Sequence, residues 1–199
     1  MKPALLTFDI FGTVIDWRAG LGDRDFDRLV DVQGELEQGR FRGYAEIVAE
    51  SLVRVRGIDV VSAARMGVEA GTWPLFPDSR EALRRMRRTA KLAATTNSDR
   101  AHGEQVQAQL GFRLDAWICA EEVRAYKPDR KIWEAASRKL GTAFDRSWWH
   151  VSAYADYDLR TARELGLTCV FVRRPHSRPG PADITVPDLA ALADAVEAS

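Results

Sequence analysis

After residue 76 the chain alternates between short apolar segments and amphipathic segments, and this alternation constrains the fold more than any other feature. The apolar segments, typical of buried strands, are 91–96, 116–120, 147–152 and 168–172. The amphipathic segments, typical of helices, are 79–88, 101–110, 127–141, 158–165 and 188–197. A first strand is predicted at 3–9, where the apolar run PALLTFD ends at an aspartate. The pattern predicts an α/β fold, in which a parallel sheet carries helices on its faces.

The first strand is separated from the later ones by residues 22–72, which have a helical pattern. Apolar residues between 44 and 55 recur at helical spacing, and Gly57 is placed to end that helix. A connection of about 60 residues is longer than an ordinary crossover. The pattern therefore predicts a helical cap, inserted over the strand ends at which open α/β sheets bind their ligands.

Charge and composition exclude several classes of protein. The 199 residues contain 29 Lys and Arg against 29 Asp and Glu, so no basic excess is available for binding nucleic acid. No apolar run reaches the ~18 residues of a membrane-spanning helix, and an aspartate and a glycine interrupt the N-terminal segment before an export signal. Cys119 and Cys169 lie in apolar runs without a CxxC motif, which predicts buried thiols in a reduced, cytoplasmic protein.

Four polar segments each lie just past a predicted strand. They are 9–13 (DIFGT), 96–98 (TNS), 127–128 (KP) and 152–158 (SAYADYD). The carboxyl ends of parallel strands lie along one edge of a sheet, so we expect these segments to meet there. Their convergence predicts a ligand-binding or catalytic site at this edge.

Asp9 and Lys127 are the candidates for chemistry at that edge. A carboxylate at the end of a strand can act as a nucleophile, and Gly12 would allow a tight turn beneath it. An aspartate that merely ends the strand in a turn is the structural alternative. Lys127 can keep a neighbouring carboxylate ionised, because an opposite charge lowers its pKa, or it can be a solvated loop lysine.

The other two segments supply further polar groups. Thr96 and Asn97 offer a hydroxyl and an amide to an anion, or they form an ordinary helix N-cap. Asp158 can serve as an acid, a base or an orienting group, or cap its own helix. His150, inside the strand at 147–152, is expected as a buried, hydrogen-bonded imidazole rather than as a ligand.

The segments FDIFGTVIDW, TTNSD, YKPDRKIW and HVSAYADYDLRTARELGLTCVFVRRP resemble, in this order, the four motifs of the haloacid dehalogenase superfamily. The resemblance extends over nearly the whole chain. It implies a Rossmann-like three-layer core formed by residues 1–14 and 76–199, with residues 15–75 as the helical cap.

Two departures from the superfamily's phosphatases indicate a subgroup. In the superfamily's phosphatases the first motif has the form DxDGT. This chain has Phe11 at the position of the second aspartate. Phosphatases carry GDxxxxD in the fourth motif, whereas Ala153 replaces the aspartate that holds Mg²⁺. The DxFGT pattern followed by Asp16 is instead similar to the 2-haloacid dehalogenases, which implies that no metal or other cofactor is needed.

The subgroup resemblance implies a hydrolase that removes halide from small 2-haloalkanoic acids. Asp9 would attack C2 of the acid, expel halide and form an aspartyl ester, which water then hydrolyses. Lys127 would keep Asp9 anionic, Thr13 would hydrogen-bond it, and Asp158 would orient or activate the water. The implied partners are the 2-haloacid and water, and related enzymes are often homodimers. An atypical phosphatase and a catalytically idle binding protein are the alternatives.

For substrate binding, the resemblance implies Asn97 with Thr96, together with Phe11, Ser152 and Trp133. Trp133 stands where the family often has a tyrosine near the site, and a core aromatic on an amphipathic helix is an equally good interpretation.

Dehalogenases also use a cap arginine as a cradle for halide and carboxylate. Counting from Asp9 places that role on Arg40, whereas matching the local Leu36–Glu37 pattern places it at Val32–Gln33, where no arginine occurs.

Overall fold

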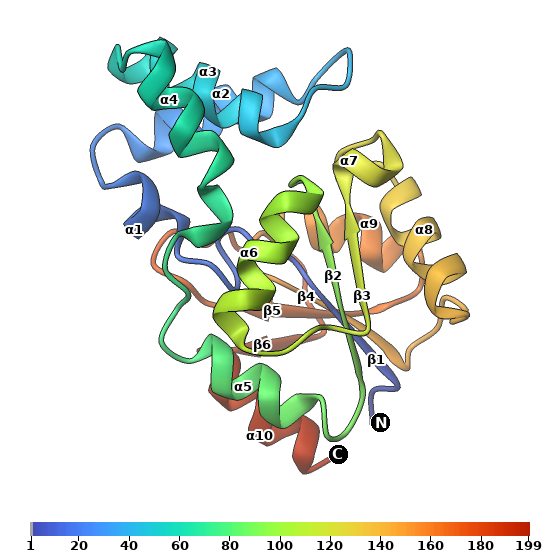
Figure 1. Ribbon diagram of the computed structural model, residues 1–199. Helices are drawn as coiled ribbons and strands as arrows, with labels where there is room; N and C mark the ends of the chain where they lie inside the picture. Colours follow the sequence, from blue (N-terminus) through green and yellow to red (C-terminus); the bar gives the residue numbers. More distant parts are fainter. Residues whose placement is uncertain (1) are drawn as a thin grey trace.

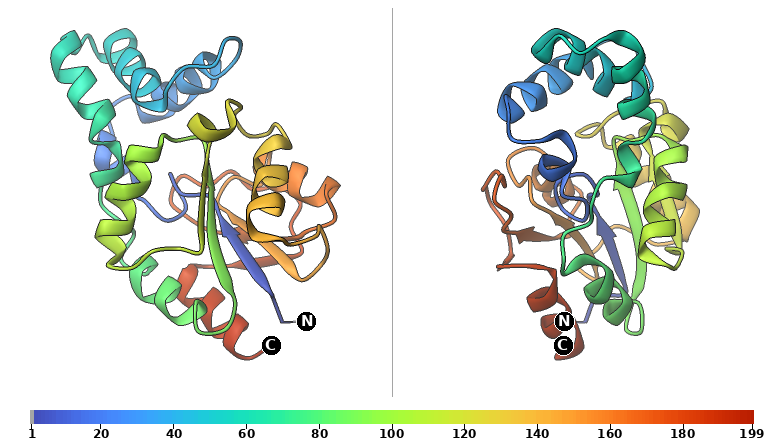
Figure 2. Two further views of the ribbon diagram at one scale, coloured as in Figure 1. Left: turned by 45° about the vertical axis from the view of Figure 1, so that its right-hand side comes forward. Right: turned by 60° about the vertical axis from the view of Figure 1, so that its left-hand side comes forward.

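The computed structural model describes residues 2–199, and it contains a six-stranded sheet in which every pairing is parallel (Figures 1 and 2). The strand order is β3-β2-β1-β4-β5-β6. The strands are β1 (Leu5–Phe8), β2 (Lys91–Thr96), β3 (Ala116–Cys119), β4 (Trp148–Ser152), β5 (Thr168–Val172) and β6 (Ile184–Val186). The chain runs outward from β1 in both directions, so β1 and its neighbours form the switch point at which such sheets bind ligands.

Helices cover both faces of the sheet and complete three layers. One layer consists of α5 (Ser79–Met86), α6 (Arg100–Leu110) and α10 (Leu189–Glu197). The opposite layer consists of α8 (Lys131–Leu140) and α9 (Asp158–Glu164), and the short α7 (Ala120–Val123) follows β3. Strands enclosed in this way are buried along their whole length and mostly apolar, as LLTF in β1 is. The predicted α/β, Rossmann-like fold is confirmed.

The helices inserted after β1 lie beyond the carboxyl ends of the strands, apart from the two helical layers (Figure 2). They are α1 (Trp17–Leu21), α2 (Phe26–Leu36), α3 (Tyr44–Arg56), α4 (Val60–Val68) and a 3₁₀ turn (Ala70–Thr72). Gly57 ends α3 with φ +65°, as its position in the sequence predicted. Among residues 2–199, no helix is both long and apolar enough to cross a bilayer.

The sequence pattern misplaced three details of the elements. The helix predicted at 127–141 begins only at Lys131, because residues 127–130 form a turn around a cis Lys127–Pro128 peptide bond. The strand β6 was not predicted, since it has only three residues and Thr185 among them is exposed. The helical pattern of 22–72 is divided into separate helices by the loops at 37–43 and 57–59.

Candidate active site

The polar segments after β1 and β2 and the loop before α8 meet at the carboxyl edge of the sheet, facing the cap (Figure 1). A cavity of about 570 Å³ lies between this edge and the cap. Its lining combines aromatic rings with charged groups, which is typical of a site for a polar organic ligand. The lining includes Asp9, Phe11, Thr96, Asn97, Arg124, Tyr126, Lys127, Lys131 and Tyr154 from the core, and Trp17, Gln33, Glu37, Phe41 and Tyr44 from the cap.

Asp9 follows β1 directly and is only 4% exposed. Thr13 Oγ1 donates a 2.7 Å hydrogen bond to Asp9 Oδ2, and Lys127 Nζ donates a 2.8 Å bond to Oδ1. The turn that returns Thr13 to Asp9 depends on Gly12, which has φ +91°; a Cβ there would lie 2.7 Å from Cε2 of Tyr154. Each carboxylate oxygen thus has one fixed donor and retains lone pairs for a reaction.

Lys127 links Asp9 to a buried chain of polar side chains. Its Nζ also donates to Asp158 Oδ2 at 2.7 Å, and Asp158 Oδ1 lies 3.0 Å from His150 Nε2. His150 Nδ1 lies 2.9 Å from Thr7 Oγ1, which accepts a 2.8 Å bond from Trp148 Nε1. The imidazole thus bridges Thr7 and Asp158, with one ring nitrogen at hydrogen-bond distance from each. The prediction of a buried, hydrogen-bonded imidazole is confirmed.

Burial and charge act in opposite directions on the three ionisable groups. Burial raises the pKa of Asp9; Lys127 offsets part of the rise, and Asp158 adds to it. Burial also acts to raise the pKa of Asp158, but Lys127 and His150 outweigh it and lower that pKa. For Lys127, the two carboxylates outweigh burial and raise the pKa, so the ammonium group stays charged.

Asp158 positions Lys127 and does not reach the cavity. Both of its carboxylate oxygens are hydrogen-bonded, and the residue is fully buried. Its lowered pKa also makes it a weak base. The structure therefore does not place Asp158 where it was expected to orient or activate a water in the cavity; its contacts are with Lys127 and His150. Its side chain does not cap α9 either, since Tyr157 occupies the N-cap position.

Two residues expected to contact substrate, Ser152 and Trp133, lie outside the cavity. Ser152 is fully buried, and its Oγ accepts a 3.0 Å bond from the backbone N–H of Tyr154. Trp133 is fully buried on α8, with its ring edge-on to that of His150 at 5.4 Å. We correct both expectations, because burial in the core keeps these side chains from the ligand. Thr13, by contrast, binds Asp9 as expected and also accepts a 2.9 Å bond from the N–H of Ala153.

The cap arginine that the residue count from Asp9 predicted does not face the cavity. Arg40 is exposed in the loop after α2 and does not line the cavity. Gln33 does line it, in agreement with the alternative register from the local sequence pattern. Its amide is held by Ser51 Oγ at 3.3 Å and by the hydroxyl of Tyr44 at 3.2 Å. The substrate cradle expected of Arg40 is therefore corrected.

Thr96 and Asn97 line the cavity as predicted, but Asn97 already has protein partners. Its Oδ1 accepts a 2.6 Å bond from the N–H of Lys127, and its Nδ2 donates to Glu37 Oε2 at 2.9 Å. The amide thus fixes the lysine loop and links it to the cap. Neither residue is the N-cap of the next helix, because Asp99 has that position.

Glu37 is the site residue that the sequence analysis did not identify. Burial raises its pKa from 4.5 to about 8, and Asn97 and Lys127 offset only part of this rise. Glu37 comes four residues after Gln33 and therefore lies on the same side of the helix end. This spacing is the sequence feature from which its position in the site could have been predicted. In the sequence, the Leu36–Glu37 pattern indicated only the register of the cap.

The apolar residues at the two motif departures take different positions. Phe11 lines the cavity as expected and packs 5.1 Å from the ring of Tyr44. Ala153 is fully buried just after β4. Across residues 2–199, no group of three His, Cys, Asp or Glu side chains has the arrangement of a metal site.

These features define a class of protein: a parallel-sheet α/β domain with a buried, lysine-bound aspartate after the first strand and a helical cap facing it. Residues 4–149 match the family model of the haloacid dehalogenase-like hydrolases. The chain belongs to this family of hydrolases, and the resemblance of its motifs to the haloacid dehalogenase superfamily is confirmed.

Solved structures with this fold include several dehalogenases. The chain is similar to the L-2-haloacid dehalogenase PA0810, with a TM-score of 0.82 and 24% identity over 100% of both chains. It is similar to an L-2-haloacid dehalogenase from Xanthobacter autotrophicus with chloropropionic acid covalently bound, with a TM-score of 0.82 and 19% identity over 98% of each chain. The defluorinating L-2-haloacid dehalogenase Rha0230 gives a TM-score of 0.80 and 21% identity over 98% of this chain and 95% of that one. No curated protein matches the chain in sequence.

Proposed function

We propose that this hydrolase cleaves the carbon–halogen bond of small 2-haloacids without a metal ion and that Asp9 is the nucleophile. The observation that carries the proposal is the state of Asp9 in the cavity. Lys127 and Thr13 each bind one of its carboxylate oxygens, and apolar Phe11 lines the cavity beside it. The fold shared with L-2-haloacid dehalogenases supports the same class of substrate.

In the first step, an oxygen of Asp9 attacks C2 of the haloacid. A C–O bond forms, the carbon–halogen bond breaks, and halide leaves with the bonding electron pair. Halide needs no proton to leave, which is consistent with Phe11 at the position of an acid in the phosphatases. Lys127 favours the reaction because it keeps Asp9 in the anionic form.

In the second step, water attacks the carbonyl carbon of the Asp9 ester. Negative charge then develops on the remaining carboxyl oxygen, and either oxygen has a donor in place, Lys127 Nζ or Thr13 Oγ1. Collapse of the tetrahedral intermediate releases the 2-hydroxy acid and restores the Asp9 carboxylate. The overall reaction consumes one water and releases one halide and one proton.

The charge distribution of the cavity supports an anionic substrate. Its basic lining residues are Arg124, Lys127, Lys131 and Arg178, against the acidic Asp9, Glu37 and Asp129. Cationic side chains around a cavity raise the local concentration of anions and increase their association rate.

The test is a halide-release assay in chelator-treated, metal-free buffer with both enantiomers of 2-chloropropionate and 2-bromopropionate. The proposal predicts stoichiometric halide and 2-hydroxy acid from the parent protein and none from a folded Asp9→Asn variant. A parallel assay supplies Mg²⁺ and a phosphate monoester. Phosphate release without halide release would identify an atypical phosphatase, and silence in both assays with an intact circular dichroism spectrum would favour a binding protein.

A further inference from the structure

Glu37 places a carboxyl group in the cavity at the cap side. It follows the last residue of α2, and its Oε2 accepts the 2.9 Å bond from Asn97 Nδ2. Within residues 2–199, no group donates a hydrogen bond to its other oxygen, Oε1. A ligand of the cavity can therefore reach an oxygen of Glu37 that the protein leaves without a donor.

The charged and titratable groups that face Glu37 give it no counter-ion of its own. The groups that act on its pKa, or on whose pKa it acts, are Lys127, Asp9, Tyr44, Tyr126 and Tyr157. Arg124, Lys131 and Arg178 also line the cavity, but within residues 2–199 none of them forms an ion pair with Glu37. Lys127 is already bound to two carboxylates, and Asp9 repels a second negative charge. The hydroxyls of Tyr44 and Tyr126 donate to Gln33 Oε1 and to the carbonyl oxygen of Arg42. These surroundings favour the neutral form of Glu37.

We propose that Glu37 determines the charge of the substrate: neutral Glu37 binds a carboxylate by donating its hydroxyl hydrogen, and ionised Glu37 excludes it. The inference rests on the proposed function for its substrate class, because a 2-haloacid carries such a carboxylate. It extends that function by assigning a role that a cap arginine does not fill in this chain, since Arg40 is exposed and Gln33 occupies the alternative position.

The interaction between Glu37 and a ligand carboxylate is attractive when Glu37 is protonated and repulsive when it is ionised. A carboxylic acid that donates to a carboxylate forms a charge-assisted hydrogen bond, which is short and strong. Two carboxylates in the same site repel each other, and Asp9 adds to the repulsion. An anionic ligand must therefore bind together with the proton on Glu37, whereas a neutral ligand has no such requirement.

This linkage has a measurable size. The pKa of Glu37 is raised to about 8, so about nine-tenths of the groups are neutral at pH 7 and about one-tenth at pH 9. Between these pH values, the Kd of a carboxylate ligand should rise roughly tenfold. By reciprocity, a saturating carboxylate should raise the pKa of Glu37.

The experiment measures binding of propionate and propionamide to the parent protein by calorimetry at pH 7 and pH 9, in two buffers with different ionisation enthalpies. We expect roughly tenfold weaker propionate binding at pH 9, proton uptake with propionate at that pH, and no pH dependence for propionamide. Glu37→Gln, which keeps a neutral donor, should bind propionate equally at both pH values. Glu35→Gln is the matched control, because it removes a carboxylate from the exposed face of the same helix and should behave as the parent does.

Propionate carries no halogen, so this result is independent of turnover. Pronounced proton-linked binding without any halide release would reject the proposed function and retain the role of Glu37. Halide release with pH-independent propionate binding, or with no propionate binding, would reject the role of Glu37. If Glu37→Gln does not fold, the pKa of Glu37 is measured in the parent by ¹³C titration of its carboxyl group, with and without propionate. A pKa that rises with propionate supports the inference, and a pKa that propionate leaves unchanged overturns it.

Discussion

Replacing Lys127 by methionine is the substitution whose cost follows most directly from the structure. Lys127 Nζ lies 2.8 Å from Asp9 Oδ1 and 2.7 Å from Asp158 Oδ2, and the three side chains are 1%, 6% and 0% exposed. Methionine keeps most of the volume and removes the charge, leaving two buried carboxylates without a cation. Breaking a buried ion pair from one side typically costs ~3–5 kcal/mol, so we expect this loss in the free energy of unfolding near neutral pH.

The loss should depend on pH with a definite sign. Without Lys127 the pKa values of Asp9 and Asp158 rise in the folded variant, so that it binds more protons than its unfolded chain does above pH ~4. Stability relative to the parent then falls as pH rises and recovers as the carboxylates are protonated. Urea unfolding at pH 8 and pH 5 should therefore give a clearly larger difference at pH 8, together with loss of halide release.

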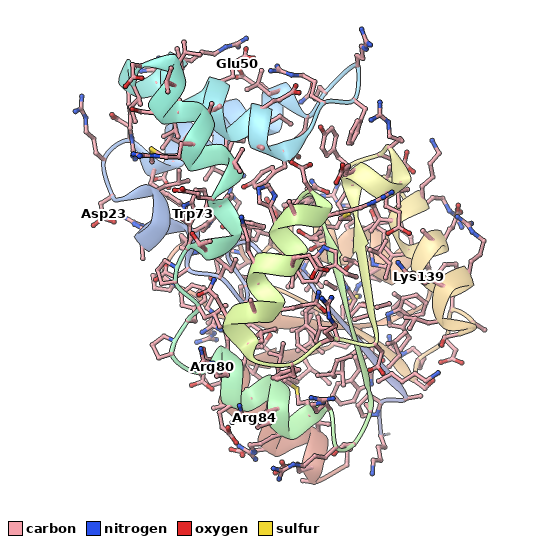
Figure 3. The ribbon with its side chains drawn as sticks, in the orientation of Figure 1. Asp23, Glu50, Trp73, Arg80, Arg84 and Lys139 are labelled. Atoms are coloured by element: carbon pink, nitrogen blue, oxygen red, sulfur yellow. The ribbon has the colours of Figure 1, made fainter. Side chains whose placement is uncertain are left out.

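Lys139→Met is the matched control. Lys139 lies near the C-terminal end of α8 (Figure 3) and does not line the cavity. Its half-exposed ammonium group lies 3.2 Å from Glu122 Oε1 and donates a 3.1 Å bond to the carbonyl oxygen of Trp117. An exposed pair of this kind contributes about 0–1 kcal/mol. Equal losses for Lys127→Met and Lys139→Met, or a Lys127→Met loss that is the same at both pH values, would refute the electrostatic account of the site.

Three further predictions concern neighbouring residues. Thr13→Val removes the donor to Asp9 Oδ2 and the acceptor for the N–H of Ala153. Urea unfolding should therefore show a loss of ~1–3 kcal/mol in the free energy of unfolding, and halide release should slow. An unchanged kcat would contradict the role of Thr13. Because the pKa of Asp9 is raised, its carboxylate is protonated on acidification at a pH above 3.8, and kcat/KM should fall there. A kcat/KM profile that stays flat down to pH 3.8 would show that Asp9 is not the titrating nucleophile. Arg40→Ala should change KM by less than about twofold, because the side chain is exposed and outside the cavity, and a tenfold rise in KM would restore Arg40 as a substrate-binding residue.

The fold was predictable from the sequence because its signals are local. Apolar runs such as TCVFV at 168–172 require burial on both faces, and glycines such as Gly57 end helices in the left-handed conformation. The strand β6 gave too weak a signal, since three residues with a polar one between two apolar ones are too short to distinguish from a loop. The turn at 127–130 was read as helical because its proline also fits the start of a helix.

The core side of the candidate site was predictable to the extent that it follows from strand ends. Asp9, Thr13 and Lys127 meet because parallel strands place their carboxyl ends at one edge. The cap side was not predictable, because the loop after α2 determines whether Arg40 or Glu37 faces the cavity.

Side-chain burial was equally inaccessible to sequence reasoning at the other site candidates. Trp133 and Ser152 stand at motif positions, yet packing of the core decides that they face away from the ligand. The hydrogen bonds of Asp158 to Lys127 and His150 likewise arise only from tertiary structure.

Covalent catalysis by Asp9 is most directly tested by a single turnover in ¹⁸O-enriched water with enzyme in excess over 2-chloropropionate. If Asp9 is the nucleophile, the first 2-hydroxy acid carries ordinary oxygen from Asp9, and mass spectrometry of the peptide containing Asp9 finds one ¹⁸O. Product that carries ¹⁸O in the first turnover, from an enzyme whose Asp9 remains unlabelled, would show direct attack by water and exclude an aspartyl ester.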